Sequence, residues 1–79
     1  MKTQMVDIAT EFIQLDQLLK WIGMTETGGQ ARFLIDEGNV KVNGLISTIR
    51  RKKIFPGDRV MIGNQEYLVV RENELNHAD

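Results

Sequence analysis

The sequence predicts a single α+β domain, and two observations lead to this prediction. Over residues 15–37 the apolar side chains recur with the spacing of an α-helix, whereas after residue 38 they alternate with polar ones, as in a β-strand. Pairs of turn-forming residues then divide the second half of the chain into short segments of strand length. We therefore expect two helices followed by two hairpins, with residues 3–8 as a candidate extra strand.

The first helix is expected over about residues 15–22. Its apolar side chains share one face at about 100° per residue, namely Leu15, Leu18, Leu19 and Ile22. Asp16 stands where an N-cap or first-turn acid stabilises a helix, and Gly23 is placed to end it.

The second helix is expected to begin at Thr27 and to stop at Gly38. Thr27 and Gln30 have the spacing of a capping box, in which each side chain satisfies a free amide of the first turn. The apolar face that follows consists of Ala31, Leu34 and Ile35. Only residues 24–26 connect the two helices, so we expect them to be neighbours that pack on each other.

The first hairpin is expected directly after the second helix. Val40 and Val42 alternate with polar neighbours, as in a strand with one buried face. Asn43 and Gly44 form the residue pair that most strongly predicts a two-residue hairpin turn, so residues 45–49 should return as the partner strand.

A second turn and a second hairpin complete the expected fold. Proline presets the backbone at the first central position of a turn and glycine accepts a positive φ at the next, so Pro56 and Gly57 predict a turn. Residues 59–62 and 66–71 then have the composition of two strands, joined around residues 63–64.

Length and composition limit the class of protein. The chain has 79 residues, 42% of them hydrophobic and 27% charged, and it contains no internal repeat or linker. We therefore expect one domain over residues 1–72, with residues 73–79 as a frayed tail. A chain this short buries only about 60% of the surface of its unfolded form, which disfavours a core plus an enclosed catalytic cavity.

The sequence also predicts the compartment. It holds no cysteine, which removes disulfides and thiolate metal sites and fits a reducing environment. Asp7 and Glu11 interrupt the segment in which a signal peptide needs an unbroken apolar stretch, and the longest apolar run is residues 67–70. We expect a cytoplasmic protein that does not enter a membrane.

Charge is distributed unevenly along the chain. The formal net charge is −1, yet residues 20–60 carry eight basic and four acidic side chains, while residues 1–19 and 61–79 are net acidic. The basic middle presents a positive field that the whole-chain value conceals. This distribution favours a polyanion such as a nucleic acid as the partner.

Residues 50–53, called the basic run below, are the strongest basic feature of the sequence: Arg50, Arg51, Lys52 and Lys53. Four adjacent cations repel one another, and a phosphate backbone would relieve that repulsion. The alternative is a solvated surface segment that serves solubility only.

The start of the second helix is another candidate for phosphate binding. Gly28 and Gly29 cost about 1 kcal/mol each in helix propensity relative to alanine, but they leave backbone N–H groups bare. A phosphate could approach these groups closely, and Arg32, one turn later, could reach it. The alternative is that the glycines permit tight packing or a turn.

Two lysines extend the basic surface if the fold brings them together with the other cations. Lys20 lies off the apolar face of the first helix, and Lys41 alternates outward from the first hairpin. Each is by itself an ordinary surface lysine. Together with Arg32 and the basic run they could line one groove between the helix pair and the hairpin.

Two aromatic side chains, Trp21 and Phe33, lie off the apolar faces of the helices. Either ring could stack on an unpaired base. The alternative is a second, minor core formed with the last hairpin and with Met5, Ile8 and Phe12. Tyr67 is expected in the core.

The sequence predicts no enzyme. His77 is the only histidine and lies in the expected tail, so no nucleophile and base can be assembled around it. No glycine-rich nucleotide-binding loop is present. Asp36 and Glu37 are adjacent and point to different sides of a helix. We expect no catalytic residue, no metal site and no cofactor.

The motifs described above also resemble a known family. The ordered series is LD-x-LL at residues 15–19, A-R-x-L-I at residues 31–35, G-x-V-x-V-N-G at residues 38–44 and P-G-D at residues 56–58. Over about residues 14–61 the chain resembles the RNA-binding domain named for ribosomal protein S-four, also called the αL motif, and its small stand-alone bacterial members. The resemblance implies two packed antiparallel helices against a small twisted, mostly antiparallel sheet.

The resemblance also implies a function. It predicts non-catalytic binding of structured RNA, with ribosomal RNA or ribosomal particles favoured over tRNA, and no small-molecule substrate. The RNA-binding residues expected on this basis are Lys20, Gly28, Gly29, Gln30, Arg32, Lys41, Asn43, Arg50, Arg51, Lys52 and Lys53.

The alternative function is a protein-interaction adaptor that keeps the fold but binds RNA weakly. Two departures from the family pattern favour it, since the family has arginine where this chain has Gln14 and a serine-arginine pair where it has Gly28 and Gly29. The acidic ends of the chain favour it as well.

Overall fold

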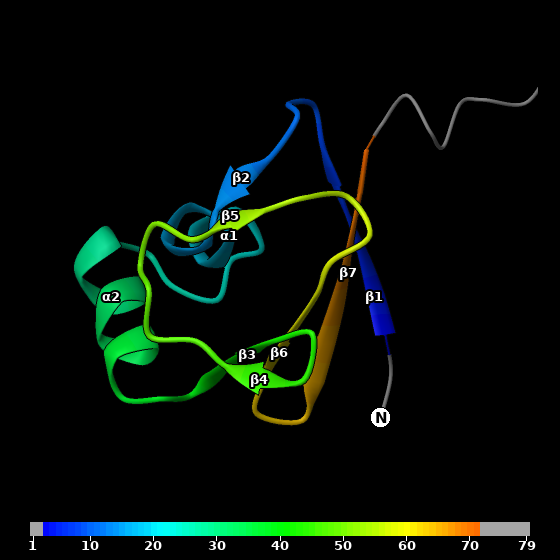
Figure 1. Ribbon diagram of the computed structural model, residues 1–79. Helices are drawn as coiled ribbons and strands as arrows, with labels where there is room; N and C mark the ends of the chain where they lie inside the picture. The colour runs from blue at the N-terminus through cyan, green and yellow to red at the C-terminus, as the bar shows by residue number, and fades with distance from the viewer. Residues whose placement is uncertain (1–2, 72–79) are drawn as a thin grey trace, which may run out of the picture.

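The computed structural model describes residues 3–71, which form two helices and seven short strands (Figure 1). In chain order the elements are β1 (Thr3–Ile8), β2 (Ile13–Gln14), α1 (Leu15–Trp21), α2 (Gly28–Asp36), β3 (Val40–Val42), β4 (Leu45–Ile46), β5 (Lys53–Ile54), β6 (Arg59–Ile62) and β7 (Gln65–Arg71). The predicted α+β class, the two adjacent helices and the candidate strand at residues 3–8 are confirmed. No helix within residues 3–71 is long and apolar enough to cross a membrane.

The strands form two sheets. The larger has the order β1-β7-β6-β3-β4, and β2 pairs with β5 in a second sheet of two strands. All neighbours are antiparallel except β1 and β7, which run parallel from Thr3 opposite Glu66 to Ile8 opposite Arg71. The expected small, mostly antiparallel sheet is thus present, and the first strand completes its edge.

The helices cover one face of the larger sheet, and the core lies between them (Figure 1). Leu15, Leu18 and Leu19 are fully buried on α1, and Ala31 and Ile35 on α2. The sheet contributes alternate apolar residues from four strands: Val6, Ile8, Val40, Val42, Val60, Ile62, Tyr67 and Val69. Tyr67 is buried, as the sequence predicts.

Turn residues fix the ends of the elements where the sequence places them. The Thr27 hydroxyl caps α2 by accepting a hydrogen bond from the Gln30 amide in the first turn, and the Gln30 side chain accepts one from the Glu26 amide, just before the helix. Asn43 and Gly44 both have positive φ, as a two-residue hairpin turn of the I′ type requires.

Two features of the strands differ from the prediction. The partner strand of the first hairpin ends at residue 46 instead of residue 49, because after Ser47, whose amide still bonds β3, the chain leaves the sheet to cross the start of α1. The short pair β2 and β5 was not predicted, since two residues are too few for alternation to be visible in a sequence. The predicted tail, residues 73–79, lies outside the described residues.

The two off-face aromatic side chains do not form a second core. Trp21 and Phe33 are each 64% exposed. The Trp21 indole donates a hydrogen bond to the Asp7 carbonyl at 3.0 Å, which ties the end of α1 to the end of β1. Phe12 instead lies 5.7 Å from Phe55, between the ring centroids.

Candidate nucleic-acid interface

The backbone of the basic run is bound to the start of α1. The Lys52 carbonyl accepts a hydrogen bond from the Leu15 amide at 2.9 Å, and the Arg50 carbonyl accepts one from the Asp16 amide at 3.0 Å. The first amides of a helix have no partner within it, and the N-cap residue Gln14 provides no side-chain bond. The basic run therefore caps the helix with its carbonyls and displays its side chains at the surface.

Arg50 is already paired within the protein. Its guanidinium donates to the carboxylate of Asp36, from Nη2 to Oδ2 at 2.7 Å and from Nε to Oδ1 at 3.1 Å. The hydrogen bond from Arg50 and the nearby charges of Arg50 and Arg32 outweigh desolvation and lower the pKa of Asp36 below its usual value of 3.8. Arg50 thus joins the basic run to the end of α2.

The other three cations of the basic run differ in their surroundings. The Lys53 ammonium lies 4.8 Å from the centre of the Phe12 ring, a cation–π arrangement. Arg51 is exposed and Lys52 is half-buried, and neither has a carboxylate partner within the described part of the chain. Lys53 also has no carboxylate partner there, so its contact with the Phe12 ring is what distinguishes it from Arg51 and Lys52.

A row of residues on α2 leads from its first turn to Arg50. Gly28, Arg32 and Asp36 are four residues apart and so lie on one face of the helix. Arg32 is exposed, and its charge lowers the pKa of Asp36 together with that of Arg50. Arg32 and Arg50 therefore both act on the charge of the same carboxylate.

The glycines at the start of α2 are not explained by packing or by backbone conformation. A Cβ added at Gly28 would meet nothing within 4 Å, and one at Gly29 would meet only the Thr27 hydroxyl at 3.8 Å. Neither glycine has a positive φ. Neither tight packing nor a positive φ therefore requires glycine at these two positions.

A hollow of about 520 Å³ borders the same helix start. Gly29, Thr25 and the exposed ring of Phe33 are among its lining residues. The Thr25 hydroxyl is buried and has no hydrogen-bond partner within residues 3–71. Periodicity could not have located this hollow, because Thr25 lies in the loop between the helices.

Two of the expected RNA-binding residues have structural roles. The Gln30 side chain takes part in the cap of α2. The Asn43 side chain donates to the Asp58 carboxylate at 3.1 Å and accepts from the Arg59 amide at 2.9 Å, which connects the β3–β4 turn to the turn before β6. Both side chains keep free hydrogen-bonding positions, but these structural bonds fix how the side chains are oriented.

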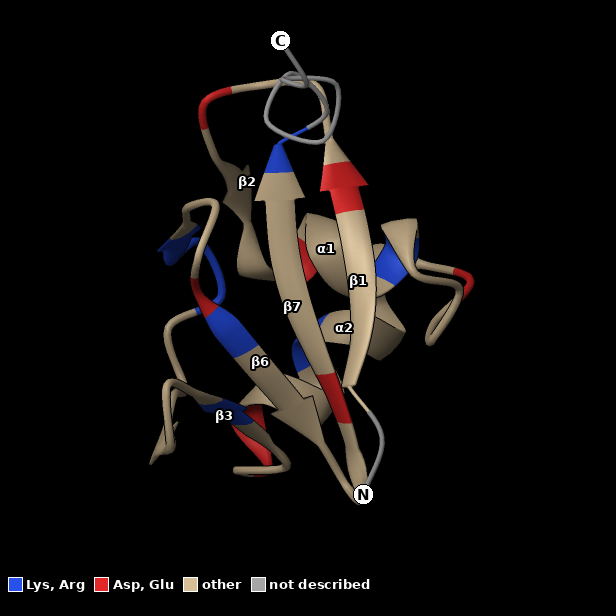
Figure 2. Cartoon of the chain, turned by 90° about the vertical axis from the view of Figure 1, so that its right-hand side faces the viewer, with Lys and Arg blue, Asp and Glu red and all other residues tan. Residues whose placement is uncertain are grey.

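Lys20 and Lys41 do not join the other cations in one groove. Lys20 lies in the last turn of α1, whereas the basic run crosses its first turn. Figure 2 shows the loop after α1 and the loop that carries the basic run at opposite edges of the molecule. Lys41 lines a hollow with Gly38 and Met61, separate from the one lined by Lys52.

An exposed apolar group adjoins the basic run and was missed in the sequence. Leu45, Ile46 and Ile49 are 75%, 61% and 62% exposed. They were assigned to a strand, in which alternate side chains would be buried. The adjacent pair Leu45-Ile46 could have indicated an exposed apolar side chain, because neighbouring residues of a strand point to opposite faces of the sheet.

Metal-ligating side chains are not clustered in the part of the chain that the structure describes. Within residues 3–71 no three histidine, cysteine, aspartate or glutamate side chains come together as ligands. Two helices packed on a small, mostly antiparallel sheet, with a basic segment bound to one helix and reaching the other, place the chain in a class of small α+β domains.

Comparison with known proteins identifies the family. The model of the S4 domain matches residues 6–70, so the chain belongs to the S4 domain family. The chain is 41% identical over 58 residues to “Putative RNA-binding protein YbcJ” of Escherichia coli, a match that covers 73% of this chain and 83% of the relative. It is 37% identical over 57 residues to “Probable ribosome maturation protein RlbA” of Bacillus subtilis, covering 72% and 80%.

The fold is similar to a solved structure. The solution structure of YbcJ from E. coli, described as revealing an αL motif involved in RNA binding, superimposes with a TM-score of 0.62 and 37% sequence identity. The match covers 86% of this chain and 85% of that one. The αL resemblance and the α+β architecture predicted from the sequence are confirmed.

Proposed function

We propose that this protein binds structured RNA, without catalysing a reaction on it, along the surface from the start of α2 to the basic run. The observation that carries the proposal is the pair Arg51 and Lys52, which have no carboxylate partner among residues 3–71 and belong to a segment whose backbone is bound to α1. A fixed pair of cations binds phosphates with little loss of backbone freedom. The names of the relatives support RNA as the polyanion.

Ribosomal RNA, free or in a ribosomal particle, is the proposed target. Support comes from the relative named as a ribosome maturation protein. The cations and helix amides contact phosphates, so recognition depends on RNA shape more than on sequence. The proposed working unit is the single domain of residues 1–72, acting in the cytoplasm.

The proposed interface is smaller than the sequence indicated. Arg32, Arg51 and Lys52 are its principal cations, with the Gly28 and Gly29 amides at the far end of α2. Lys20 and Lys41 lie outside it. About three neutralised phosphates correspond to a slope of log K against log salt of about −2 to −3.

A pair of charge-matched double variants tests this proposal. Arg51→Ala with Lys52→Ala should weaken binding to a ribosomal stem-loop and reduce the salt slope by about 1.4 to 1.8. Lys20→Ala with Lys41→Ala removes the same charge elsewhere and should change the slope by much less. Equal effects of the two variants would overturn the proposed location, and a slope near zero for the unaltered protein would overturn RNA binding.

The adaptor role is the second candidate, and the exposed apolar side chains Leu45, Ile46 and Ile49 favour it. Co-sedimentation with ribosomal particles distinguishes the two functions. An RNA-binding protein is released by ribonuclease or high salt, whereas an adaptor bound to ribosomal proteins stays with the particle.

A further inference from the structure

A buried hydroxyl without a partner lies beside the basic run. Ser47 is 8% exposed, and its Oγ has no hydrogen-bond partner among residues 3–71. Its own amide donates to the Val40 carbonyl at 3.0 Å, so its backbone is fixed to β3. Buried hydroxyls are nearly always hydrogen-bonded, so this group is suited to accept or donate a bond to a molecule from outside.

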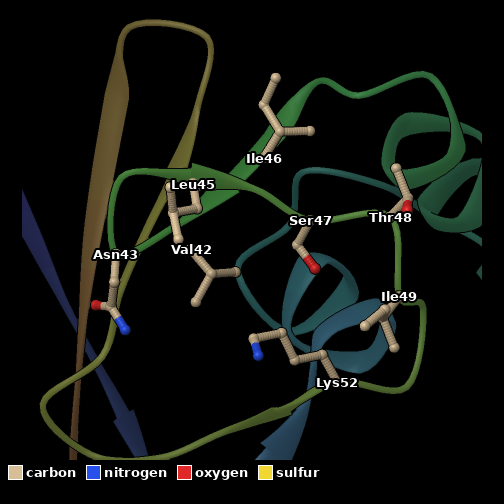
Figure 3. A pocket seen from close by; sticks show the side chains of 8 residues that line it. All are labelled: Val42, Asn43, Leu45, Ile46, Ser47, Thr48, Ile49 and Lys52. Atoms are coloured by element: carbon tan, nitrogen blue, oxygen red, sulfur yellow. The ribbon is translucent and has the colours of Figure 1, made fainter.

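The hydroxyl faces a hollow of about 360 Å³, within the size range of small-ligand pockets. In Figure 3 the Ser47 hydroxyl and the Lys52 side chain point toward the same space, with Val42 and Ile49 on either side, while Ile46 points away. Val42 is buried and forms an apolar wall, and Ile49 is exposed at the rim.

The chemistry of the hollow combines flat apolar contact with hydrogen-bond donors. The ammonium of Lys52 carries donors only, and the Ser47 hydroxyl can donate or accept. A fitting ligand therefore has apolar faces and acceptor atoms on its edge. Every nucleobase meets this description, because each presents ring faces and at least one acceptor edge.

Charge and position favour RNA over a protein side chain as the occupant. Lys52 belongs both to the hollow and to the proposed phosphate-binding surface, and Arg51 precedes it without a counter-ion in the described chain. A phosphate held by Arg51 would bring its own nucleotide to the hollow. An apolar protein side chain would leave both the Ser47 hydroxyl and the Lys52 ammonium unpaired.

We propose that the hollow between β4 and the basic run receives one unpaired base of the bound RNA, with its acceptor edge toward Ser47 Oγ and Lys52 Nζ. The base lies between the side chains of Val42 and Ile49. This inference rests on the proposed RNA binding. It adds a site that holds one base to the contacts with phosphates.

Two pentamers that differ only in their bases separate the two proposals. One is a mixed-sequence pentaribonucleotide, and the other is an abasic pentamer with the same number of phosphates. In an NMR titration of the whole protein at low salt, both should shift the amide signals near Arg51. Only the base-bearing pentamer should also shift those of Ser47 and Ile49.

Each other outcome has a defined meaning. Equal binding of the two pentamers with no signal change at Ser47 overturns the base pocket but not RNA binding. The occupant of the hollow would then be a protein partner. No binding of either pentamer overturns the base pocket, and no binding of the ribosomal stem-loop either overturns the proposed function itself. A response at Ser47 to the abasic pentamer means that the hollow holds a phosphate, which also overturns the inference.

Two variants of the hollow and one control complete the test. Ser47→Ala should lower the affinity for the base-bearing pentamer about 3- to 10-fold, the effect of losing one hydrogen bond. The affinity for the abasic pentamer should not change. Ile49→Gln removes the apolar rim without changing the charge and should act in the same direction. Met5→Gln alters a residue of matched exposure, 61%, on β1 and should affect neither pentamer. If Ser47→Ala and Ile49→Gln behave like this control, the hollow does not bind a base.

Discussion

The carboxylate of Asp36 holds the guanidinium of Arg50 through two hydrogen bonds, the shorter of 2.7 Å, across 14 positions of sequence. One cation of the basic run therefore carries a counter-ion supplied by the protein. The pair lies between Arg32 and Arg51, at the point where the proposed RNA surface passes from α2 to the basic run. The affinity of the proposed surface for phosphates thus depends partly on Asp36, an acidic residue within it.

Releasing Arg50 should strengthen RNA binding. In Asp36→Asn the guanidinium loses its counter-ion and becomes available to a phosphate, so the slope of log K against log salt should become steeper by about 0.7 to 0.9. Glu37→Gln serves as the control, because it removes the same charge at the next position, where no side-chain bond to residues 3–71 holds it. Weaker binding by Asp36→Asn than by this control would mean that the pair positions the basic run.

The same pair predicts a dependence of stability on pH. Arg50 lowers the pKa of Asp36 below 3.8, so the folded protein holds this carboxylate charged more strongly than the unfolded chain does. Its contribution to stability is complete above about pH 4 and is lost as the pH falls through the lowered pKa. Carboxyl-carbon NMR titration should give a low pKa for Asp36 that returns to its usual value in Arg50→Gln. An unshifted Asp36 in the unaltered protein would contradict this.

Alanine at Gly28 should raise stability and lower RNA affinity. The site has a helical backbone and no atom within 4 Å of a new Cβ, so Gly28→Ala should stabilise the protein by about 0.5 kcal/mol or somewhat more. The same methyl group would stand between a phosphate and the bare amides. Urea unfolding and RNA titration of one variant measure both effects. If the variant gains stability and keeps its affinity for RNA, these amides do not contact the RNA.

Asn43 should matter for stability more than for RNA. Its φ is 52°, and its side chain bonds Asp58 and the Arg59 amide. Asn43→Ala loses both bonds and strains the backbone, so the free energy of unfolding should fall by about 1 to 2 kcal/mol. Asn43→Gly loses the bonds but tolerates the positive φ and should cost less. A larger loss in the glycine variant would show that conformational strain is not involved.

Local signals predicted most of the fold, and long-range contacts explain the rest. The Thr27 cap and the Asn43-Gly44 turn depend on residues within a few positions, so their patterns are visible in the chain. The path of residues 47–52 is set by bonds to Leu15 and Asp16, more than thirty positions away. No local pattern predicts such a bond, and the partner strand was therefore expected to be too long.

The candidate site divides in the same way. The bare amides of Gly28 and Gly29 and the free charges of Arg51 and Lys52 were predicted from residue type, and they remain proposals. The pairing of Arg50 with Asp36 depends on how the basic run meets α2, which a list of charges does not contain. The same is true of Ser47, because its hydroxyl is notable only once it is known to be buried without a partner.

The parallel pair of β1 and β7 affects the order in which this chain can mature. Thr3 bonds Glu66 across 63 positions, so the first strand to be synthesised lacks its neighbour until almost the whole domain has been translated. The α2 helix and the β3–β4 hairpin need only nearby partners and can form earlier. The sheet edge closes last, after residue 71 has left the ribosome that makes it, and a nascent chain stalled before that point would expose the apolar side of β1 to other partners.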